Sequence, residues 1–192
     1  MVRPEVTEGP YYLDVDLVRS DIREDRGGTP FNLTFNVLDV GDSGCNALQG
    51  AKVDIWHCDA AGAYSGVSDP GFSTEGQKWL RGSQTTDASG TARFTTIYPG
   101  SYPGRAVHIH FKVRPDERSE FTSQLFFDDT LSTQVFSQAP YASGGTEPDT
   151  PNREDNIYKE ELLLTITKSG EGYAATFPIG IDRSTLGAIG SQ

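Results

Sequence analysis

Two of the three histidines in the sequence, His108 and His110, are two positions apart. In an extended strand such residues project from the same face, so both imidazoles could bind one metal ion. The competing interpretation is two polar side chains on the solvated face of a half-exposed strand. With so few histidines in the chain, the pairing favours a metal site. Two imidazoles do not complete one, however, and His57 is the only other histidine.

Two tyrosines in turn-like segments supply further candidate ligands. Tyr64 lies in Ala61–Gly66 and Tyr102 in Pro99–Gly104, and each alone would be interpreted as a surface residue. Two phenols together with two imidazoles suit a hard trivalent ion such as Fe(III), whose charge lowers a tyrosine pKa far below its ordinary value of about 10. Two phenolates and a hydroxide would neutralise the ion and reduce the cost of burying it. A zinc or copper protein using the two histidines remains an alternative.

Other motifs carry little weight. The Gly41–Gly44 run resembles the turn around a protease serine, but every histidine lies downstream and such runs are common turns. A P-loop, a dinucleotide fingerprint and an H-E-x-x-H motif are all absent. Asp128 and Asp129 are interpreted as a solvated turn rather than an acid/base dyad.

Alternating apolar residues predict a series of short strands that would position these groups. In Ala106–Arg114 the apolar residues Val107, Ile109, Phe111 and Val113 share one face, opposite the two histidines. The other predicted strands are Phe31–Leu38, Ala51–Trp56, Thr91–Ile97, Ser123–Phe127, Glu161–Thr167 and Tyr173–Phe177. Turns are predicted at Asp42–Gly44, Asp87–Gly90 and Lys168–Gly172.

Helix signals are weak. Leu13–Arg23 and Glu154–Glu161 are each expected to carry a turn or two, and Ser137–Asn156 to form a long surface loop. The 21 glycines and 11 prolines suit many turns. We therefore predict an all-β fold, a β-sandwich of mixed and antiparallel sheets with long loops and short helical turns, in one domain spanning residues 1–192.

Charge and length exclude several classes of partner. The 192 residues carry a formal net charge of −11, which disfavours nucleic acid and anionic membrane surfaces. No apolar stretch approaches a membrane span, and no signal peptide is visible. The expectation is therefore a cytoplasmic protein or one whose targeting segment has been removed.

The two cysteines do not by themselves show whether the protein contains a disulfide. Cys45 and Cys58 are either two small buried residues or one disulfide closing a short loop. A disulfide would indicate an oxidising compartment. The residues alone leave both possibilities open.

Several blocks carry a family resemblance. They are Thr7–Tyr12 with its E-G-P-x-Y pattern, Gly50–His57, Gly62 with Tyr64 and Ser65, Thr96–Pro103, Arg105–Phe111, and Ser123–Phe127. Together they resemble the intradiol ring-cleaving dioxygenases from about Thr7 to Phe127. All four candidate ligands recur in order with their flanking residues.

The resemblance implies a non-haem Fe(III) held by Tyr64, Tyr102, His108 and His110 with a hydroxide. A catechol-type diol would displace the hydroxide and Tyr102. O2 as co-substrate would then enter the ring, which opens between the hydroxyl-bearing carbons to a cis,cis-muconate-type diacid. A non-catalytic β-sandwich binding module that lost the iron is the alternative, which retention of all four ligands disfavours.

Further roles follow from the same resemblance. Arg105 would stabilise the developing anion, Gln124 would line the pocket, and Thr7 and Pro10 would contact the substrate ring. Without the resemblance, Arg105 would be interpreted as a surface salt bridge and Gln124 as an ordinary strand amide.

Two departures from the usual family pattern bear on assembly and location. Dimeric cytoplasmic relatives carry an additional N-terminal helical segment for which this chain has no room, and the stretch from Tyr102 to His108 is shorter than in many relatives. The resemblance is closest to secreted single-domain members. It implies a monomer, an extracellular location and a Cys45–Cys58 disulfide.

Overall fold

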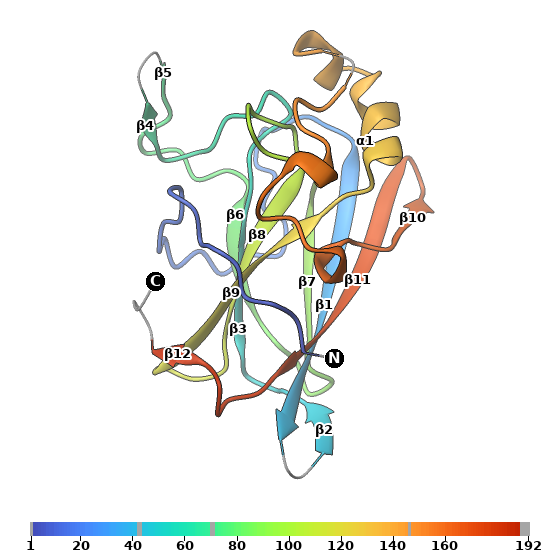
Figure 1. Cartoon of the computed structure of the whole chain (residues 1–192). Coiled ribbons are helices and arrows are strands. Elements are labelled where there is room, and N and C mark those ends of the chain that lie inside the picture. The colour runs from blue at the N-terminus through green and yellow to red at the C-terminus, as the bar shows by residue number, and fades with distance from the viewer. Residues whose placement is uncertain (1, 42–43, 70–71, 146, 189–192) are drawn as a thin grey trace.

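Two five-stranded sheets form the molecule (Figure 1). The computed structural model describes residues 2–41, 44–69, 72–145 and 147–188. The first sheet contains β1 (Pro30–Gly41), β2 (Gly44–Ala47), β7 (Thr91–Ile97), β10 (Ile166–Ser169) and β11 (Gly172–Ile181). The second contains β3 (Lys52–Trp56), β6 (Arg81–Thr85), β8 (His108–Arg114), β9 (Ser119–Phe126) and β12 (Gly187–Ala188).

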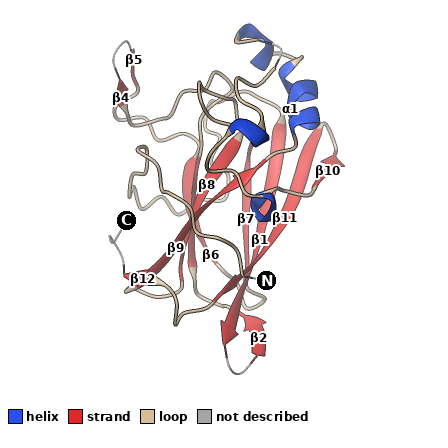
Figure 2. Cartoon of the chain, viewed as in Figure 1, coloured by secondary structure: helices blue, strands red, loops and turns tan. Residues whose placement is uncertain are grey.

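The remaining elements are short. A hairpin of β4 (Ser68–Asp69) and β5 (Phe72–Ser73) stands apart from both sheets. Figure 2 shows strands as the dominant element, with the helical segments among the loops. They are α1 (Asp129–Phe136) and the 3₁₀ turns η1 (Tyr141–Ser143), η2 (Asn152–Glu154) and η3 (Glu160–Leu162).

The long strand β1 organises the first sheet. It pairs in parallel with β11 on one side. On its other side, residues 30–36 pair antiparallel with β7 and residues 38–41 with β2. The prediction of a sandwich with mixed and antiparallel pairing is therefore confirmed.

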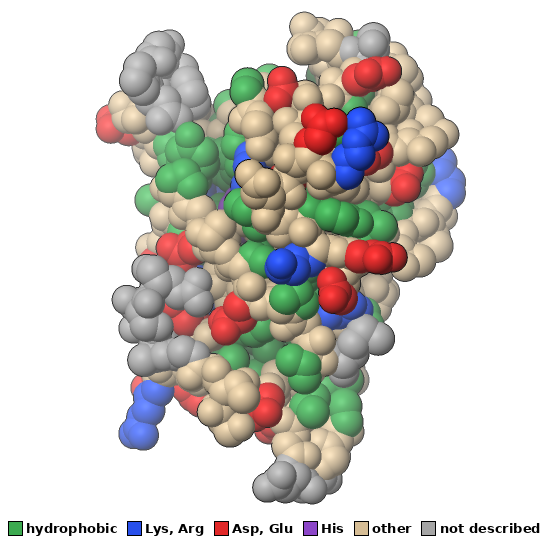
Figure 3. Space-filling model, viewed as in Figure 1, with side chains coloured by type: hydrophobic (Ala, Val, Ile, Leu, Met, Phe, Trp, Pro, Cys, Tyr) green, Lys and Arg blue, Asp and Glu red, His purple; other side chains and the backbone are tan. Residues whose placement is uncertain are grey.

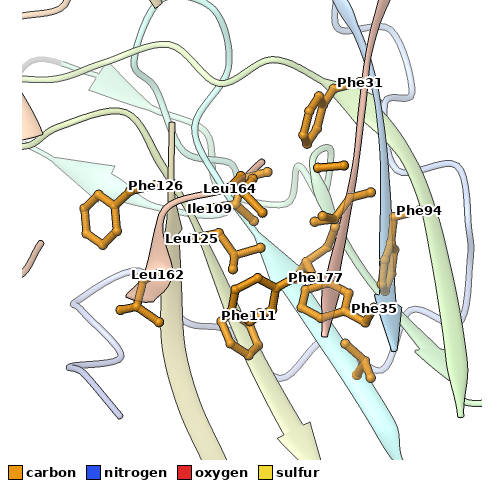
Figure 4. Close-up of a cluster of buried hydrophobic side chains, with 14 of the residues drawn as sticks. Phe31, Phe35, Phe94, Ile109, Phe111, Leu125, Phe126, Leu162, Leu164 and Phe177 are labelled. Atoms are coloured by element: carbon orange, nitrogen blue, oxygen red, sulfur yellow. The ribbon is translucent and has the colours of Figure 1, made fainter. Parts of the chain in front are cut away.

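Aromatic side chains fill the space between the sheets (Figure 4). The alternation of β1 buries Phe31, Leu33, Phe35 and Val37, as the sequence predicts. The Phe35 ring lies 5.2 Å from the Phe111 ring, centroid to centroid, and thereby joins the two sheets. Because the core is packed on this face of β8, the opposite face is available for chemistry.

The N-terminal segment covers that opposite face. In the second sheet β8 lies between β3 and β9, and all but its last residue is buried. Val6 donates its N–H to Thr122 O of β9, while Lys112 Nζ lies 2.5 Å from Glu8 Oε2 and 3.0 Å from Glu120 Oε1. The interpretation of the histidines as residues of a solvated strand face is therefore wrong.

Several predicted elements are moved or replaced. Leu13–Arg23 forms no helix; it is irregular apart from isolated bridges from Val18 to Ser83 and from Asp21 to Thr95. The predicted strand Glu161–Thr167 is largely wrong, because η3 occupies its start and β10 begins only at Ile166. Helix α1 was not predicted: Asp128, expected in a turn, caps it by accepting the Leu131 N–H.

The loop and turn predictions have mixed outcomes. The stretch from Ser137 to Asn156 does form a long connection, but it contains two 3₁₀ turns and buries Tyr141 and Asn152. The predicted turn at Asp42–Gly44 lies largely outside the described residues.

The predicted disulfide is not formed: Cys45 and Cys58 are free cysteines. Cys45 is exposed on β2, in the hairpin at the bottom of Figure 1, whereas Cys58 is buried beyond the far end of β3. The four steps of β3 from Lys52 to Trp56 advance about 13 Å at strand geometry, and a disulfide needs Cα atoms within roughly 7 Å. The intervening strand therefore holds the two thiols apart.

Among the described residues, no helix has both the length and the apolar character needed to cross a membrane.

Candidate metal centre

The two histidines of β8 converge on one point. Their Nε2 atoms are 3.0 Å apart, and both side chains are almost fully buried. The His108 Nδ1 lies 2.6 Å from Ala106 O, so this nitrogen carries the proton and donates it to the carbonyl. The lone pair of His108 Nε2 is thereby directed at the same point as His110 Nε2. On the face that Figure 3 draws, only a trace of histidine is visible.

The two tyrosines reach this point from separate loops. Tyr64 follows β3 and is 2 % exposed, while Tyr102 lies between β7 and β8 and is half-buried. The hydroxyls of Tyr64 and Tyr102 lie 3.4 Å and 3.2 Å from His108 Nε2. Residues distant in sequence thus bring two oxygens and two nitrogens together.

These distances fit a shared metal ion. Ligand atoms about 2.1 Å from a common ion are separated from one another by roughly 3.0–3.4 Å. The separations from His108 Nε2 to the other three donor atoms, 3.0–3.4 Å, match that spacing. Two neutral imidazoles and two phenols that can ionise form a donor set suited to a hard trivalent cation.

A polar chain crosses the site beside these donors. Arg105 donates from Nη2 to Gln124 Oε1 at 2.5 Å, and Gln124 donates from Nε2 to the Thr7 carbonyl at 2.9 Å. Arg105 Nη1 is 3.5 Å from His108 Nε2. Arg105 therefore lies beside the point where the four donor atoms converge, and hydrogen bonds connect it to Gln124 and, through Gln124, to Thr7. Pro10 is exposed and follows Gly9, which packs on His110.

Comparisons with known proteins agree with this geometry. The family model described as dioxygenase matches residues 7–172. The fold of an intradiol ring-cleavage dioxygenase from Tetranychus urticae superposes with a TM-score of 0.85, at 32 % identity over 95 % of both chains. The chain belongs to the intradiol ring-cleavage dioxygenase family.

Other relatives of the intradiol family are more distant or longer. The dioxygenase domain of a dioxygenase–carbohydrate-binding protein fusion from Streptomyces sp. SirexAA-E aligns with a TM-score of 0.70, at 27 % identity over 95 % of this chain and 99 % of that one. A chlorocatechol 1,2-dioxygenase from Pseudomonas putida is 32 % identical over 140 residues, 63 % of this chain and 52 % of its own length. This intradiol chain thus spans about half the length of the curated relatives it matches first.

Burial separates the protonation behaviour of the two ligand types. It lowers the pKa of His108 to about 3, helped by Arg105, and lowers the pKa of His110 well below its ordinary value, helped by His108. It raises the pKa of both Tyr64 and Tyr102. Without a cation, the imidazoles are therefore neutral and the phenols protonated at neutral pH. A cation bound by these phenols would have to displace their protons.

The third histidine does not belong to this intradiol site. His57 Nδ1 pairs with Cys58 O at 2.8 Å and its Nε2 with Thr96 Oγ1 at 2.7 Å, so both nitrogens are engaged. Within the described ranges, no group of three or more His, Cys, Asp and Glu side chains could hold a metal ion. A metal ion held by the histidine pair would therefore need the tyrosines as further ligands.

Sequence reasoning missed several side chains that shape the intradiol site. The Trp56 ring stacks on the His110 ring with centroids 5.1 Å apart, and the Tyr11 ring stacks on Tyr64 at 4.7 Å. Both lie inside the blocks that carried the family resemblance, so a signal was present. A Cβ at Gly9 would lie 3.0 Å from His110 Cε1, which explains a glycine with φ +74° there.

Arg81 was also missed. This buried cation donates from Nη2 to Ser65 O at 2.7 Å and from Nη1 to Tyr11 O at 2.7 Å. It therefore fastens the residue after Tyr64 to the N-terminal segment that stacks on Tyr64. No sequence pattern around Arg81 marks this role.

Proposed function

We propose that this protein is a non-haem Fe(III)-dependent dioxygenase that inserts both atoms of O2 into a catechol-type aromatic diol. Cleavage between the two hydroxyl-bearing carbons would give a cis,cis-muconate-type diacid. The observation that carries this proposal is the convergence of two phenol oxygens and two imidazole nitrogens on one buried point, beside a guanidinium.

The donor set favours iron over the alternatives. A zinc or copper site built on His108 and His110 would want a third histidine, a thiolate or a carboxylate, and the described residues offer none beside that pair. A binding module without metal would have no use for four converging donors. Both imidazoles remain buried and neutral, which costs stability unless a ligand uses them.

The chain's own residues would divide the work. Bound Fe(III) would supply the Lewis acidity that holds the diol as a catecholate and activates it towards O2. Tyr102 is the more exposed phenol and lies on the more accessible loop, which suits the ligand that leaves when substrate arrives. Arg105 would stabilise negative charge on the substrate oxygens, and Gln124 would line the pocket; the contacts of Arg105 with His108 Nε2 and with Gln124 Oε1 support these roles. Thr7 and Pro10 would line the pocket beside the substrate ring.

Iron content, colour and oxygen uptake test the proposal together. Protein loaded with iron should be purple-red to brown, because phenolate-to-Fe(III) charge transfer absorbs visible light. Added catechol should consume one O2 per diol and yield a muconate-type diacid by mass spectrometry. A colourless protein with stoichiometric zinc and no oxygen uptake would contradict it, and His108→Ala protein is the matched control.

Three other expectations stay predictions. They are a monomeric state, a single catalytic domain over residues 1–192 and an extracellular location. The free cysteines remove the disulfide that would have supported the last.

A further inference from the structure

Asp155 is a buried carboxylate that sequence analysis did not single out. It ends η2, and its side chain is 1 % exposed. Its Oδ2 accepts two hydrogen bonds, from Arg105 Nε and from the Ala106 N–H, each at 2.9 Å. Its Oδ1 accepts the Ile157 N–H at 2.8 Å. One carboxylate thus gathers both the guanidinium and the backbone at the start of the histidine strand.

The second hydrogen bond reaches a metal ligand. Ala106 donates its N–H to Asp155, and its carbonyl oxygen accepts a hydrogen bond from His108 Nδ1 at 2.6 Å. Asp155 therefore fixes the residue that sets the tautomer and ring direction of His108. The direct hydrogen-bond partner of a metal-bound histidine, which here would be the Ala106 carbonyl, typically contributes 10–100-fold to metal affinity or activity.

The first hydrogen bond concerns charge. Arg105 Nη1 lies 3.5 Å from His108 Nε2, the nitrogen that faces the other donor atoms. A guanidinium this close repels a cation bound at that nitrogen, and the repulsion grows with the charge of the cation. The Asp155 carboxylate is the acidic partner of Arg105 and cancels much of that field. The arginine can then serve substrate oxygens without opposing the metal.

We propose that Asp155 is a positioning residue that holds Arg105 and His108 in register and neutralises Arg105, so that a trivalent cation can bind beside it. This inference rests on the proposed metal site. Burial opposes a charged carboxylate, but hydrogen bonds from Ile157, Ala106 and Arg105 outweigh it and leave the pKa of Asp155 below its ordinary value. The carboxylate is therefore ionised in the conditions where the metal binds.

Metal competition tests the electrostatic part. Parent, Asp155→Asn and Asp129→Asn proteins would each be loaded with Ga(III) or with Zn(II) and titrated with a chelator of known affinity. Asp129 is the matched control, because its carboxylate anchors the Asn152 N–H of the same loop without contacting Arg105. We expect Asp155→Asn to lower the affinity for Ga(III) at least tenfold and the affinity for Zn(II) by a smaller factor. Asp129→Asn should change neither affinity.

A double variant separates charge from folding. Adding Arg105→Met to Asp155→Asn removes the uncompensated cation and should restore most of the lost Ga(III) affinity. The Arg105 Nε–H resonance, followed by NMR in the same proteins, should lose its protection from exchange in Asp155→Asn and keep it in Asp129→Asn.

The outcomes are distinct. Equal losses for the two metals, or no recovery in the double variant, would overturn the inference. Failure of the parent protein to bind either metal at the tyrosines and histidines would instead overturn the proposed function.

Discussion

The four proposed ligands come from two kinds of structure. His108 and His110 lie on β8, which pairs with β9 from His108 to Val113 and with β3 from His110 to Arg114. Tyr64 and Tyr102 lie on loops that follow β3 and β7. The strand fixes its ligands through sheet register, so their relative position follows from backbone geometry alone. The loops lack the strand-to-strand hydrogen bonds of a sheet, so other contacts must fix the positions of their ligands.

The tyrosine loops obtain that order from one another. Gly100 donates its N–H to Asp59 O at 3.1 Å, and Cys58 Sγ is 3.4 Å from Gly100 O. A Cβ at Gly62 would stand 2.3 Å from Ser101 O. The two loops therefore interlock through close backbone contacts. The sheet therefore positions the histidine half of the site, while loop-to-loop packing positions the tyrosine half.

The largest effect is expected from the strand. His108→Ala or His110→Ala should reduce Fe(III) affinity by more than about 100-fold, because each removes a ligand that no loop movement can replace. Metal analysis after chelator competition measures the loss. If either variant retained stoichiometric iron, the strand would not be the organising half of the site.

Arg105 lies between the two halves, and its removal should separate binding from turnover. Arg105→Ala should keep iron and colour but lower turnover of catechol by roughly 100-fold or more, as for a lost oxyanion donor. Oxygen uptake and the visible spectrum measure the two effects. Parent-like turnover would make Arg105 structural, and loss of iron would mean that it holds the β8 strand in place.

Within the loop half, the two phenols should differ. Tyr64→Phe should weaken Fe(III) and shift the colour more than Tyr102→Phe, because Tyr64 is buried against Tyr11 and is expected to stay bound throughout turnover. Chelator competition and the charge-transfer band measure both. Equal effects would contradict the assignment of Tyr102 as the exchanging ligand.

The protons released on metal binding should also distinguish the histidines of the strand from the tyrosines of the loops. Burial keeps the histidines neutral, with the pKa of His108 at about 3, and raises the pKa of both tyrosines. Metal binding at neutral pH must therefore expel phenol protons but no imidazole protons, so affinity should rise with pH. Each Tyr→Phe variant should lower the slope of log affinity against pH by about one. A slope that stayed unchanged would show that the missing phenol was never a ligand.

A single added methyl group should disrupt the packing between the two tyrosine loops. Gly62→Ala places a methyl group 2.3 Å from Ser101 O and should spread the loops, weakening iron binding about tenfold while β8 stays intact. Gly76→Ala is the control: its φ is +78° against +85° at Gly62, but its Cβ meets no atom within 4 Å. Both share the backbone cost of about 1–2 kcal/mol. Only Gly62→Ala should release iron to a chelator more readily.

The smallest effect concerns thiol reactivity. Cys45 is exposed and should react at once with a thiol reagent. Cys58 is buried between the loops, and burial raises its pKa, so it should react only when the loops separate. Intact-mass spectrometry should find one fast and one slow label, with the slow one slower still in iron-loaded protein. If neither cysteine reacted with the reagent, the two cysteines would be joined in a disulfide.

Local signals in the sequence sufficed for much of the fold and for the identity of the ligands. Apolar alternation predicts β1, β3, β7 and β8 closely, because a half-buried strand must alternate its side chains. It failed where contacts are distant. The residues after Leu13 look capable of a helical turn but form isolated bridges to β6 and β7, at Ser83 and Thr95, instead.

The candidate site divides in the same way. Spacing alone places His108 and His110 on one face, and the flanking motifs point to Tyr64, Tyr102 and Arg105. Only the tertiary structure brings Asp155 to Arg105, 50 positions away, and Arg81 to Tyr11, 70 positions away. It also decides that Cys45 and Cys58, 13 positions apart, stay separate. Residue type and short-range spacing determine which groups can bind a metal; strand length and loop packing decide which of them meet.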